Sequence, residues 1–196
     1  MSRKPCDATA PTRSPACLEN EPVRLIYLDE SVRAGRYLLA ASETDALGAA
    51  QVRRAQGDIV LSGQRRLHFK SESAARRRVI LGAIVELPVS VTVLTCQGLG
   101  DAASRRLLLG ALTRLIQSDS RESTLFIERV DGSVALDQSA ITSARQPDPV
   151  LTWHHLAPHE DPALWVSDAA AWAVGAGGDW RRRIEPVVRD VIEISP

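Results

Sequence analysis

The stretch LIYLDES, residues 25–31, is an apolar run that ends in two adjacent carboxylates, Asp29 and Glu30. Its first four residues are typical of a short buried strand, because aliphatic and aromatic side chains suit a covered, pleated surface. A carboxylate is costly to bury unless it is paired or binds a metal. Two interpretations follow: the acids emerge into solvent where the strand ends, or they belong to a functional site.

The composition indicates one globular domain. The chain has 196 residues, of which 44% are hydrophobic, enough to form a sizeable core. Its 24 basic and 24 acidic residues balance, so it lacks the strongly basic character of a dedicated nucleic-acid-binding domain. This balance does not exclude an enzyme that acts on nucleic acid.

The first twenty residues are rich in Pro, Ser, Thr and Ala and show no periodicity, so we expect a disordered tail over 1–20 and a folded domain over 21–196. They contain no apolar segment typical of a signal peptide. The three cysteines form no CxxC pair, and no run approaches the ~18 apolar residues of a membrane span. We therefore expect a cytoplasmic protein that does not associate with membranes.

The hydrophobic periodicity predicts alternating strands and helices after an opening hairpin. The predicted strands cover 23–29, 36–42, 89–96, 123–130 and 150–156. The predicted helices cover 43–56 with Thr44 as a cap, 74–87, 101–117, 133–144, 163–177 and a more polar segment over 179–191 that Pro186 interrupts. This order indicates an α/β fold in which one mixed sheet is flanked by helices.

Three segments of this sheet deliver acids that could meet. Asp29 and Glu30 lie at the end of one strand, Glu128 lies at the end of another, and Asp168 lies in an otherwise apolar helix. In open α/β sheets, sites form at the carboxyl ends of the strands. Converging carboxylates would make a hard oxygen site suited to Mg²⁺ or Mn²⁺, and a pair of such ions can polarise a phosphodiester and activate water.

Each acid also has a purely structural interpretation. Glu128 could pair with an exposed arginine, and Asp29 could be a turn residue. Asp168 could be a helix N-cap or an acid of the first turn, where the helix dipole favours a negative charge. Within the pair, Asp29 is the better candidate ligand, because strand alternation directs Glu30 to the opposite face.

Two basic side chains precede the helix predicted to begin at residue 74. His68 could act as a general acid or base or contact a phosphate, or it could be half-buried and structural. Lys70 could offer a point charge to a phosphate.

Two further patterns carry weaker alternatives. His154, His155 and His159 suggest zinc, but their spacing crosses Pro158 and no cysteine lies near. The run 181–183 of three arginines beside a tryptophan could contact a nucleic acid or form a solvated helix face. The sequence contains no GxGxxG after a strand, no GxxxxGK[ST], no GxSxG and no HExxH.

Three motifs together resemble a known family. YLDES (27–31), LHFKSES (67–73) and LWVSDAAAWAVGAGGDWRRR (164–183) occur in the order found in the bacterial family called domain of unknown function 3800, over roughly residues 23–185. The resemblance implies a ribonuclease H-like fold. It matches Asp29 and Glu30 to the first-strand acids, His68 to the histidine of the LHF motif, and Asp168 to the last-helix acid.

Glu128 corresponds to the family's middle acid by position only. Two residues depart from the family pattern: Val32 stands where a glycine often follows the DES segment, and Ser167 replaces the alanine before the last-helix aspartate. These departures affect the expected shape of the loop more than the acids.

We therefore expect a ribonuclease H-like, divalent-metal-dependent nuclease or related phosphoryl-transfer enzyme whose partner is nucleic acid. Asp29, Glu128 and Asp168 would hold Mg²⁺ or Mn²⁺, Glu30 would be a fourth acid, and His68 and Lys70 would orient the phosphate or the attacking water. The alternative is a catalytically inactive binding or regulatory module with the same fold.

Overall fold

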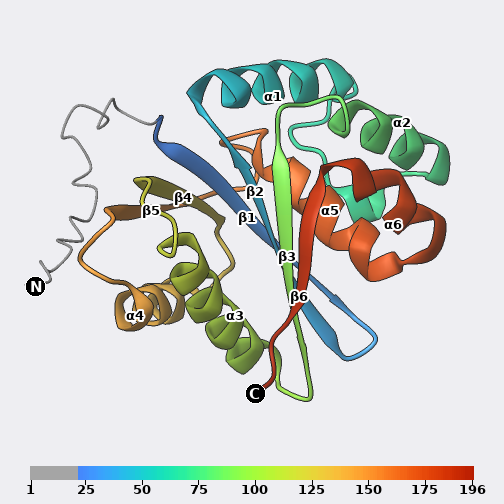
Figure 1. Ribbon diagram of the computed structural model, residues 1–196. Coiled ribbons are helices and arrows are strands. Elements are labelled where there is room, and N and C mark those ends of the chain that lie inside the picture. Colours follow the sequence, from blue (N-terminus) through green and yellow to red (C-terminus); the bar gives the residue numbers. More distant parts are fainter. Residues whose placement is uncertain (1–21) are drawn as a thin grey trace, which may run out of the picture.

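A six-stranded mixed sheet forms the centre of the computed structural model, which describes residues 22–196 (Figure 1). The tail predicted over 1–20 lies outside the described residues. The expected α/β architecture, one mixed sheet flanked by helices, is confirmed.

The strands lie in the order β5-β4-β1-β2-β3-β6. Neighbouring pairs β1/β2 and β2/β3 are antiparallel, whereas β1/β4, β4/β5 and β3/β6 are parallel. The strand bounds are β1 Arg24–Arg33, β2 Arg36–Thr44, β3 Ser90–Gln97, β4 Ser123–Glu128, β5 Leu151–Leu156 and β6 Val188–Glu193.

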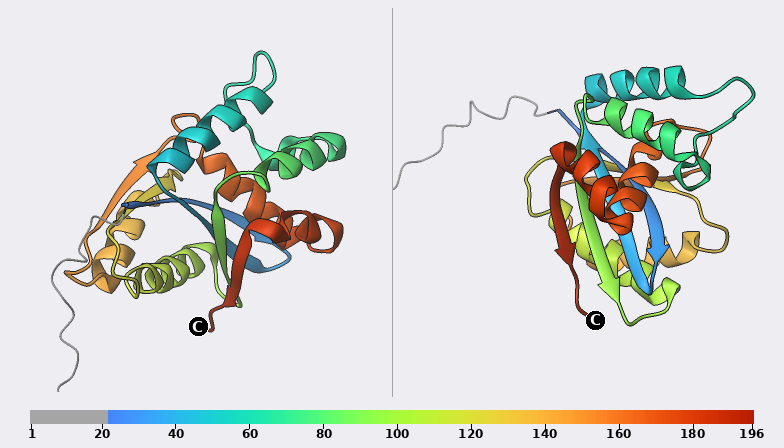
Figure 2. Two further views of the ribbon diagram at one scale, coloured as in Figure 1. Left: turned by 45° about the horizontal axis from the view of Figure 1, so that its top comes forward. Right: turned by 90° about the vertical axis from the view of Figure 1, so that its right-hand side faces the viewer.

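Helices cover both faces of the sheet, and each face has its own apolar core. The helices α1, α2, α5 and α6 pack on one face, while α3 and α4 pack on the other (Figures 1 and 2). Their bounds are α1 Ala46–Ile59, α2 Ala74–Ile84, α3 Asp101–Ile116, α4 Val134–Ala144, α5 Leu164–Ala176 and α6 Gly178–Ile184, with short 3₁₀ turns at η2 Phe69–Ser71 and η3 Glu185–Val187.

The central strand β1 divides its side chains between these two cores. Ile26 and Leu28 pack toward α3, and Tyr27 packs toward α5. Because strand side chains alternate, this assignment directs Asp29 toward the α5 face and Glu30 toward the α3 face.

A tight turn joins β1 to β2. Ala34 and Gly35 both have positive φ, 51° and 73°, as the two central residues of a type I′ hairpin turn require. The hairpin therefore extends further than the sequence predicted, and Arg33 pairs with Arg36 directly before the turn.

Two sequence predictions are wrong. In the helical segment predicted over 179–191, α6 ends at Ile184 and Pro186 lies in the following 3₁₀ turn, but the residues after this interruption form strand β6 and not a helix. The cap of α1 is Asp45, whose carboxylate accepts from the backbone of Gly48, and not Thr44. Within residues 22–196, no helix is both long and apolar enough to cross a membrane.

Candidate functional site

Asp29 and Glu128 lie on the same face of neighbouring parallel strands. Leu28 of β1 is in register with Ile127 of β4, so the next residue of each strand carries its carboxylate toward the α5 side. Glu128 ends its strand, as predicted, but β1 continues to Arg33 and places Asp29 within the sheet beside Ala40. Asp29 is consequently buried, with 8% of its surface exposed.

Asp168 comes from α5, which is fixed to the sheet one residue earlier. Ser167 Oγ donates a 2.7 Å hydrogen bond to the backbone oxygen of Tyr27 and lies 2.8 Å from Ser42 Oγ. Ser167 is fully buried and bonds two residues before Asp29 on β1. These bonds hold the part of α5 that carries Asp168 directly over the strand that carries Asp29.

The start of α5 is held by a second polar contact. Asp161 accepts from the backbone N–H of Ala163 at 3.0 Å and forms a bidentate pair with Arg53 of α1. Arg53 also donates to the hydroxyl of Tyr27 at 2.9 Å. The helix that presents Asp168 is therefore tied to both α1 and β1.

The three acids repel one another. Burial raises the pKa of Asp29 well above its ordinary value, and the charges of Asp168 and Glu128 raise it further. Burial followed by the charge of Asp168 also raises the pKa of Glu128. Such mutual repulsion among part-buried carboxylates is characteristic of sites that bind a cation or transfer protons.

Neighbouring groups from the LHF segment partly balance these charges. Arg66 Nη1 lies 3.6 Å from Glu128 Oε1, and His68 Nδ1 lies 3.5 Å from Asp168 Oδ2. The same Asp168 oxygen accepts the backbone N–H of Phe69 at 2.8 Å. Asp168 raises the pKa of His68, whose side chain is 45% exposed.

Asp29 has no such cationic partner. The only hydrogen bond to its side chain within residues 22–196 is from the backbone N–H of Glu30, at 2.7 Å. A buried carboxylate that faces two other acids and no cation has the donor chemistry that suits Mg²⁺ or Mn²⁺. In the described part of the chain, however, no three His, Cys, Asp or Glu side chains are placed to hold one metal ion together.

Glu30 does not join this cluster. Its carboxylate lies on the opposite face of the sheet and pairs with Arg105 of α3. Arg105 also forms a bidentate pair with buried Asp137, at 2.7 and 2.9 Å, and His155 Nε2 lies 3.0 Å from Asp137. The expectation of Glu30 as a fourth acid of the site is corrected: strand alternation separates it from Asp29.

The other predicted residues take separate positions. Lys70 is exposed in η2, and no contact places its ammonium group at the acids. His154 stacks on Phe126 at 5.7 Å, whereas His155 belongs to the Asp137 network, so these histidines do not face a common point. Zinc is not supported in residues 22–196.

A solved structure with a similar fold is the ribonuclease H2 from Pyrococcus horikoshii OT3. The two chains superpose with a TM-score of 0.52 at 15% identity, over 83% of this chain and 74% of that one. This chain has a ribonuclease H-like fold. A second structure, Bst-RNase HIII in complex with Mn²⁺, has a TM-score of 0.42 at 16% identity and matches over 87% of this chain and 58% of that one.

No protein-family model matches the sequence, and no curated protein is significantly similar to it. The likeness to the ribonuclease H2 structure supports the ribonuclease H-like fold, and the resemblance to the domain of unknown function 3800 stays a prediction.

The sequence did not assign a role in the site to three residues, although Ser167 stood out as a departure from the family pattern. Arg66 pairs with Glu128, Ser167 fixes α5 to β1, and Asp161 fixes the start of that helix. Arg66 lies two residues before His68 and directly precedes the LHF motif. Nothing else in the sequence distinguishes it from the other arginines.

Proposed function

We propose that this protein is a divalent-metal-dependent phosphodiester hydrolase that acts on nucleic acid. The observation that carries the proposal is the buried, cation-free Asp29 facing Glu128 and Asp168 on one face of the sheet. A bound cation would relieve the mutual repulsion of these carboxylates, whereas a purely structural role does not explain why three acids lie so close together. The ribonuclease H-like fold agrees with this activity.

Asp29, Glu128 and Asp168 would hold the cation. When bound, a divalent cation would polarise the phosphodiester and help to activate the attacking water. For it to bind, Arg66 must leave Glu128, and the exposure of the Arg66 side chain allows this movement. Asp168 would stay oriented through its bond from the Phe69 backbone.

His68 would act at the edge of the site. Asp168 raises its pKa, so a larger fraction of the imidazole carries a proton near neutral pH than in an isolated histidine. Water would attack phosphorus, a new P–O bond would form, and the bond to the leaving sugar oxygen would break. In this scheme protonated His68 orients the phosphate or gives its proton to the leaving oxygen.

The test is cleavage of a panel of fluorescent single-stranded, double-stranded and hybrid DNA and RNA oligonucleotides with Mg²⁺ or Mn²⁺. Asp29→Asn should abolish cleavage and keep a native circular dichroism spectrum, because it removes a ligand without changing shape. Asp58→Asn, at an exposed position on α1, should cleave like the wild type. Cleavage retained by Asp29→Asn, or absent from the wild type on every substrate, contradicts the proposal.

A binding or regulatory module without catalysis is the second candidate. Arg66 on Glu128, together with the lack of a preformed three-residue metal site in residues 22–196, favours it. Calorimetric titration with Mn²⁺ separates the two candidates. If the protein is a hydrolase, the wild type should bind Mn²⁺, the Arg66→Ala variant should bind it more tightly, and the Asp168→Ala variant should not bind it. If the protein is a binding module, the wild type should bind no Mn²⁺.

A further inference from the structure

Three arginines lie over two tryptophans next to the acid cluster. Arg33 and Arg77 lie over the ring of Trp172, at 5.1 and 4.3 Å from its centroid, and Arg78 lies over Trp180 at 5.6 Å. The two indole rings contact each other edge to face at 5.6 Å. We call these five residues the arginine–tryptophan surface.

The surface brings together distant parts of the chain. Arg33 ends β1, the other two arginines lie in α2, and the tryptophans lie in α5 and α6. In Figure 1 the tip of the β1–β2 hairpin, α2, α5 and α6 all lie on the right-hand side of the molecule. The fold thus brings Arg33 of the hairpin and the two arginines of α2 next to tryptophans that lie much later in the sequence.

These arginines differ from those that stabilise the fold. Arg53 and Arg105 pair with carboxylates, but within residues 22–196 no carboxylate forms an ion pair with any arginine of the arginine–tryptophan surface. Arg77 donates to the backbone oxygens of Phe69 and Lys70, which restricts its side chain. These bonds occupy Nε and Nη2 of Arg77, whereas within residues 22–196 the guanidinium groups of Arg33 and Arg78 donate no hydrogen bond and are available for phosphate oxygens.

The surface is continuous with the acid cluster. Asp168 and Trp172 lie four residues apart on α5, so they share one face of the helix about 6 Å apart along its axis. Phe69 connects them, since its backbone N–H donates to Asp168 and its ring contacts Trp172 edge to face at 5.3 Å. A chain of phosphates on the arginines would thus lead directly to the acids.

We propose that the arginine–tryptophan surface binds the sugar–phosphate backbone of the nucleic acid whose cleaved bond reaches Asp29, Glu128 and Asp168. The inference rests on the proposed function for its choice of ligand. In this proposal the guanidinium groups contact phosphates and not base edges, so binding is independent of base sequence. The run 181–183 contributes less, since Arg182 and Arg183 pair with Asp179.

The test measures binding without cleavage. Fluorescence anisotropy with labelled single-stranded and duplex oligonucleotides in EDTA, at about 50 to 200 mM salt, gives the slope of log affinity against log salt. The exposed pair Arg33→Gln/Arg78→Gln should bind more weakly at every salt concentration, for every base sequence, and should lower this slope by about 2. Adding Arg77→Gln should lower it further.

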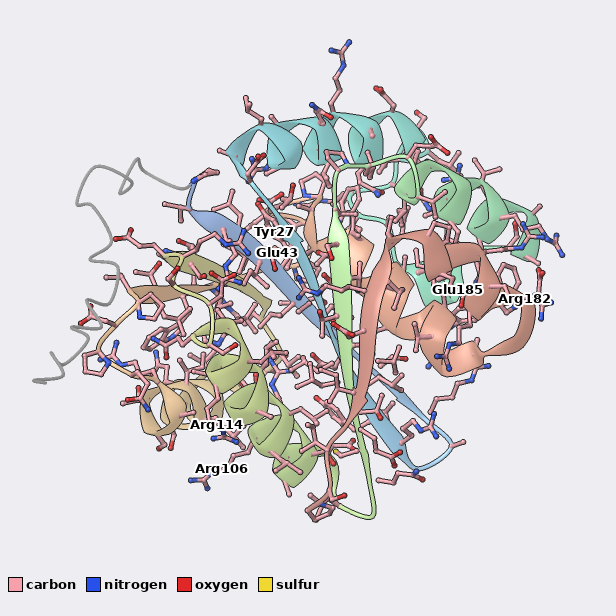
Figure 3. All side chains as sticks on the ribbon, viewed as in Figure 1. Tyr27, Glu43, Arg106, Arg114, Arg182 and Glu185 are labelled. Carbon is pink, nitrogen blue, oxygen red and sulfur yellow. The ribbon has the colours of Figure 1, made fainter. Side chains whose placement is uncertain are left out.

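A matched variant controls for overall charge. Arg106→Gln/Arg114→Gln removes the same charge from exposed positions of α3, on the other side of the molecule (Figure 3), and should leave the slope unchanged. Arg145→Gln removes an arginine that lies over Trp153 at 5.4 Å, away from the acids, and should also have no effect. Equal losses in the test and control variants would overturn the proposal.

The two proposals fail separately. If the wild type binds oligonucleotide through these arginines but never cleaves it, the hydrolase is wrong and the binding surface stands. If the wild type cleaves but Arg33→Gln/Arg78→Gln binds like the wild type, the binding surface is wrong. If the wild type binds no oligonucleotide at all, the binding-surface proposal is also wrong, and an acidic protein becomes the alternative ligand of this surface.

Discussion

Asp29 and Glu30 are neighbours in β1, but their side chains leave opposite faces of the sheet. Glu30 meets the guanidinium of Arg105, which offsets part of the rise in pKa that burial causes. Asp29 meets only other acids and one backbone N–H. Two adjacent carboxylates therefore have different roles: Glu30 forms a structural ion pair, and Asp29 belongs to the candidate site.

We expect Asp29→Asn to increase the free energy of unfolding at neutral pH without divalent metal. The folded-state pKa of Asp29 is raised, so the ionised carboxylate destabilises the fold above that pKa, and this penalty disappears as pH falls toward the ordinary carboxyl range. The variant should gain about 0.5–2 kcal/mol near pH 7 and progressively less toward pH 4.

Urea denaturation across this pH range provides the measurement. Asp58→Asn, an exposed carboxylate on α1, serves as the control and should stay within about 0.5 kcal/mol of the wild type. A loss of stability in Asp29→Asn at pH 7 would mean that the carboxylate is a structural partner.

The acids of the candidate site were visible in the sequence, whereas the groups that surround them were not. Asp29, Glu128 and Asp168 stand out because each is a charge beside or within an apolar run. The pairing of Arg66 with Glu128 depends on how a loop crosses the end of β4, and no local pattern encodes such a crossing.

At the scale of elements, one hydroxyl joins α5 directly to the two central strands of the sheet. Ser167 bonds to the backbone of β1 and contacts Ser42 of β2, in the middle of an otherwise apolar interface. Ser167 directly precedes Asp168 and bonds two residues before Asp29, so these bonds help to define where Asp168 stands relative to Asp29.

Ser167→Ala should destabilise the protein by about 1–3 kcal/mol, because it leaves Ser42 buried without this partner. It should also weaken cleavage more than stability alone explains, since Asp168 loses its fixed position. Denaturation and cleavage assays measure the two effects. Ser120→Ala, at an exposed turn, should change neither, and equal activity of Ser167→Ala and wild type would contradict the positioning role.

Most elements follow from local periodicity, and the exception is instructive. Ile184, Val187 and Val191 recur at helical spacing, which favours helical structure on both sides of Pro186 within 179–191. The structure instead pairs 188–193 with β3, a strand almost a hundred residues earlier. Local spacing cannot report a partner so distant in sequence, and pairing with an open sheet edge decides the conformation.

At the scale of the whole molecule, two charged clusters occupy opposite faces of one sheet. On the α5 face, the acids repel one another. On the α3 face, Asp137 is fully buried and compensated by Arg105 and His155. Stability and the proposed chemistry are therefore supported by different layers of the molecule.

Asp137→Asn should destabilise the protein by about 3–5 kcal/mol, because it leaves the buried guanidinium of Arg105 without its main partner. It should leave the Mn²⁺ affinity of the folded protein unchanged, since the sheet separates this cluster from the acids. Urea denaturation and calorimetry measure the two properties. A change in Mn²⁺ affinity without a change in stability would contradict this separation of roles.

The last strand, β6, also affects the tendency of this protein to aggregate. Without β6, the edge of the sheet would be β3, whose SVTVLTCQ sequence is rich in β-branched residues and has the features of segments that recruit further strands into aggregates. β6 covers that edge and presents Arg189, Asp190 and Glu193 along its exposed length. The edge of the sheet is therefore a short, charged strand, which disfavours pairing with strands of other molecules.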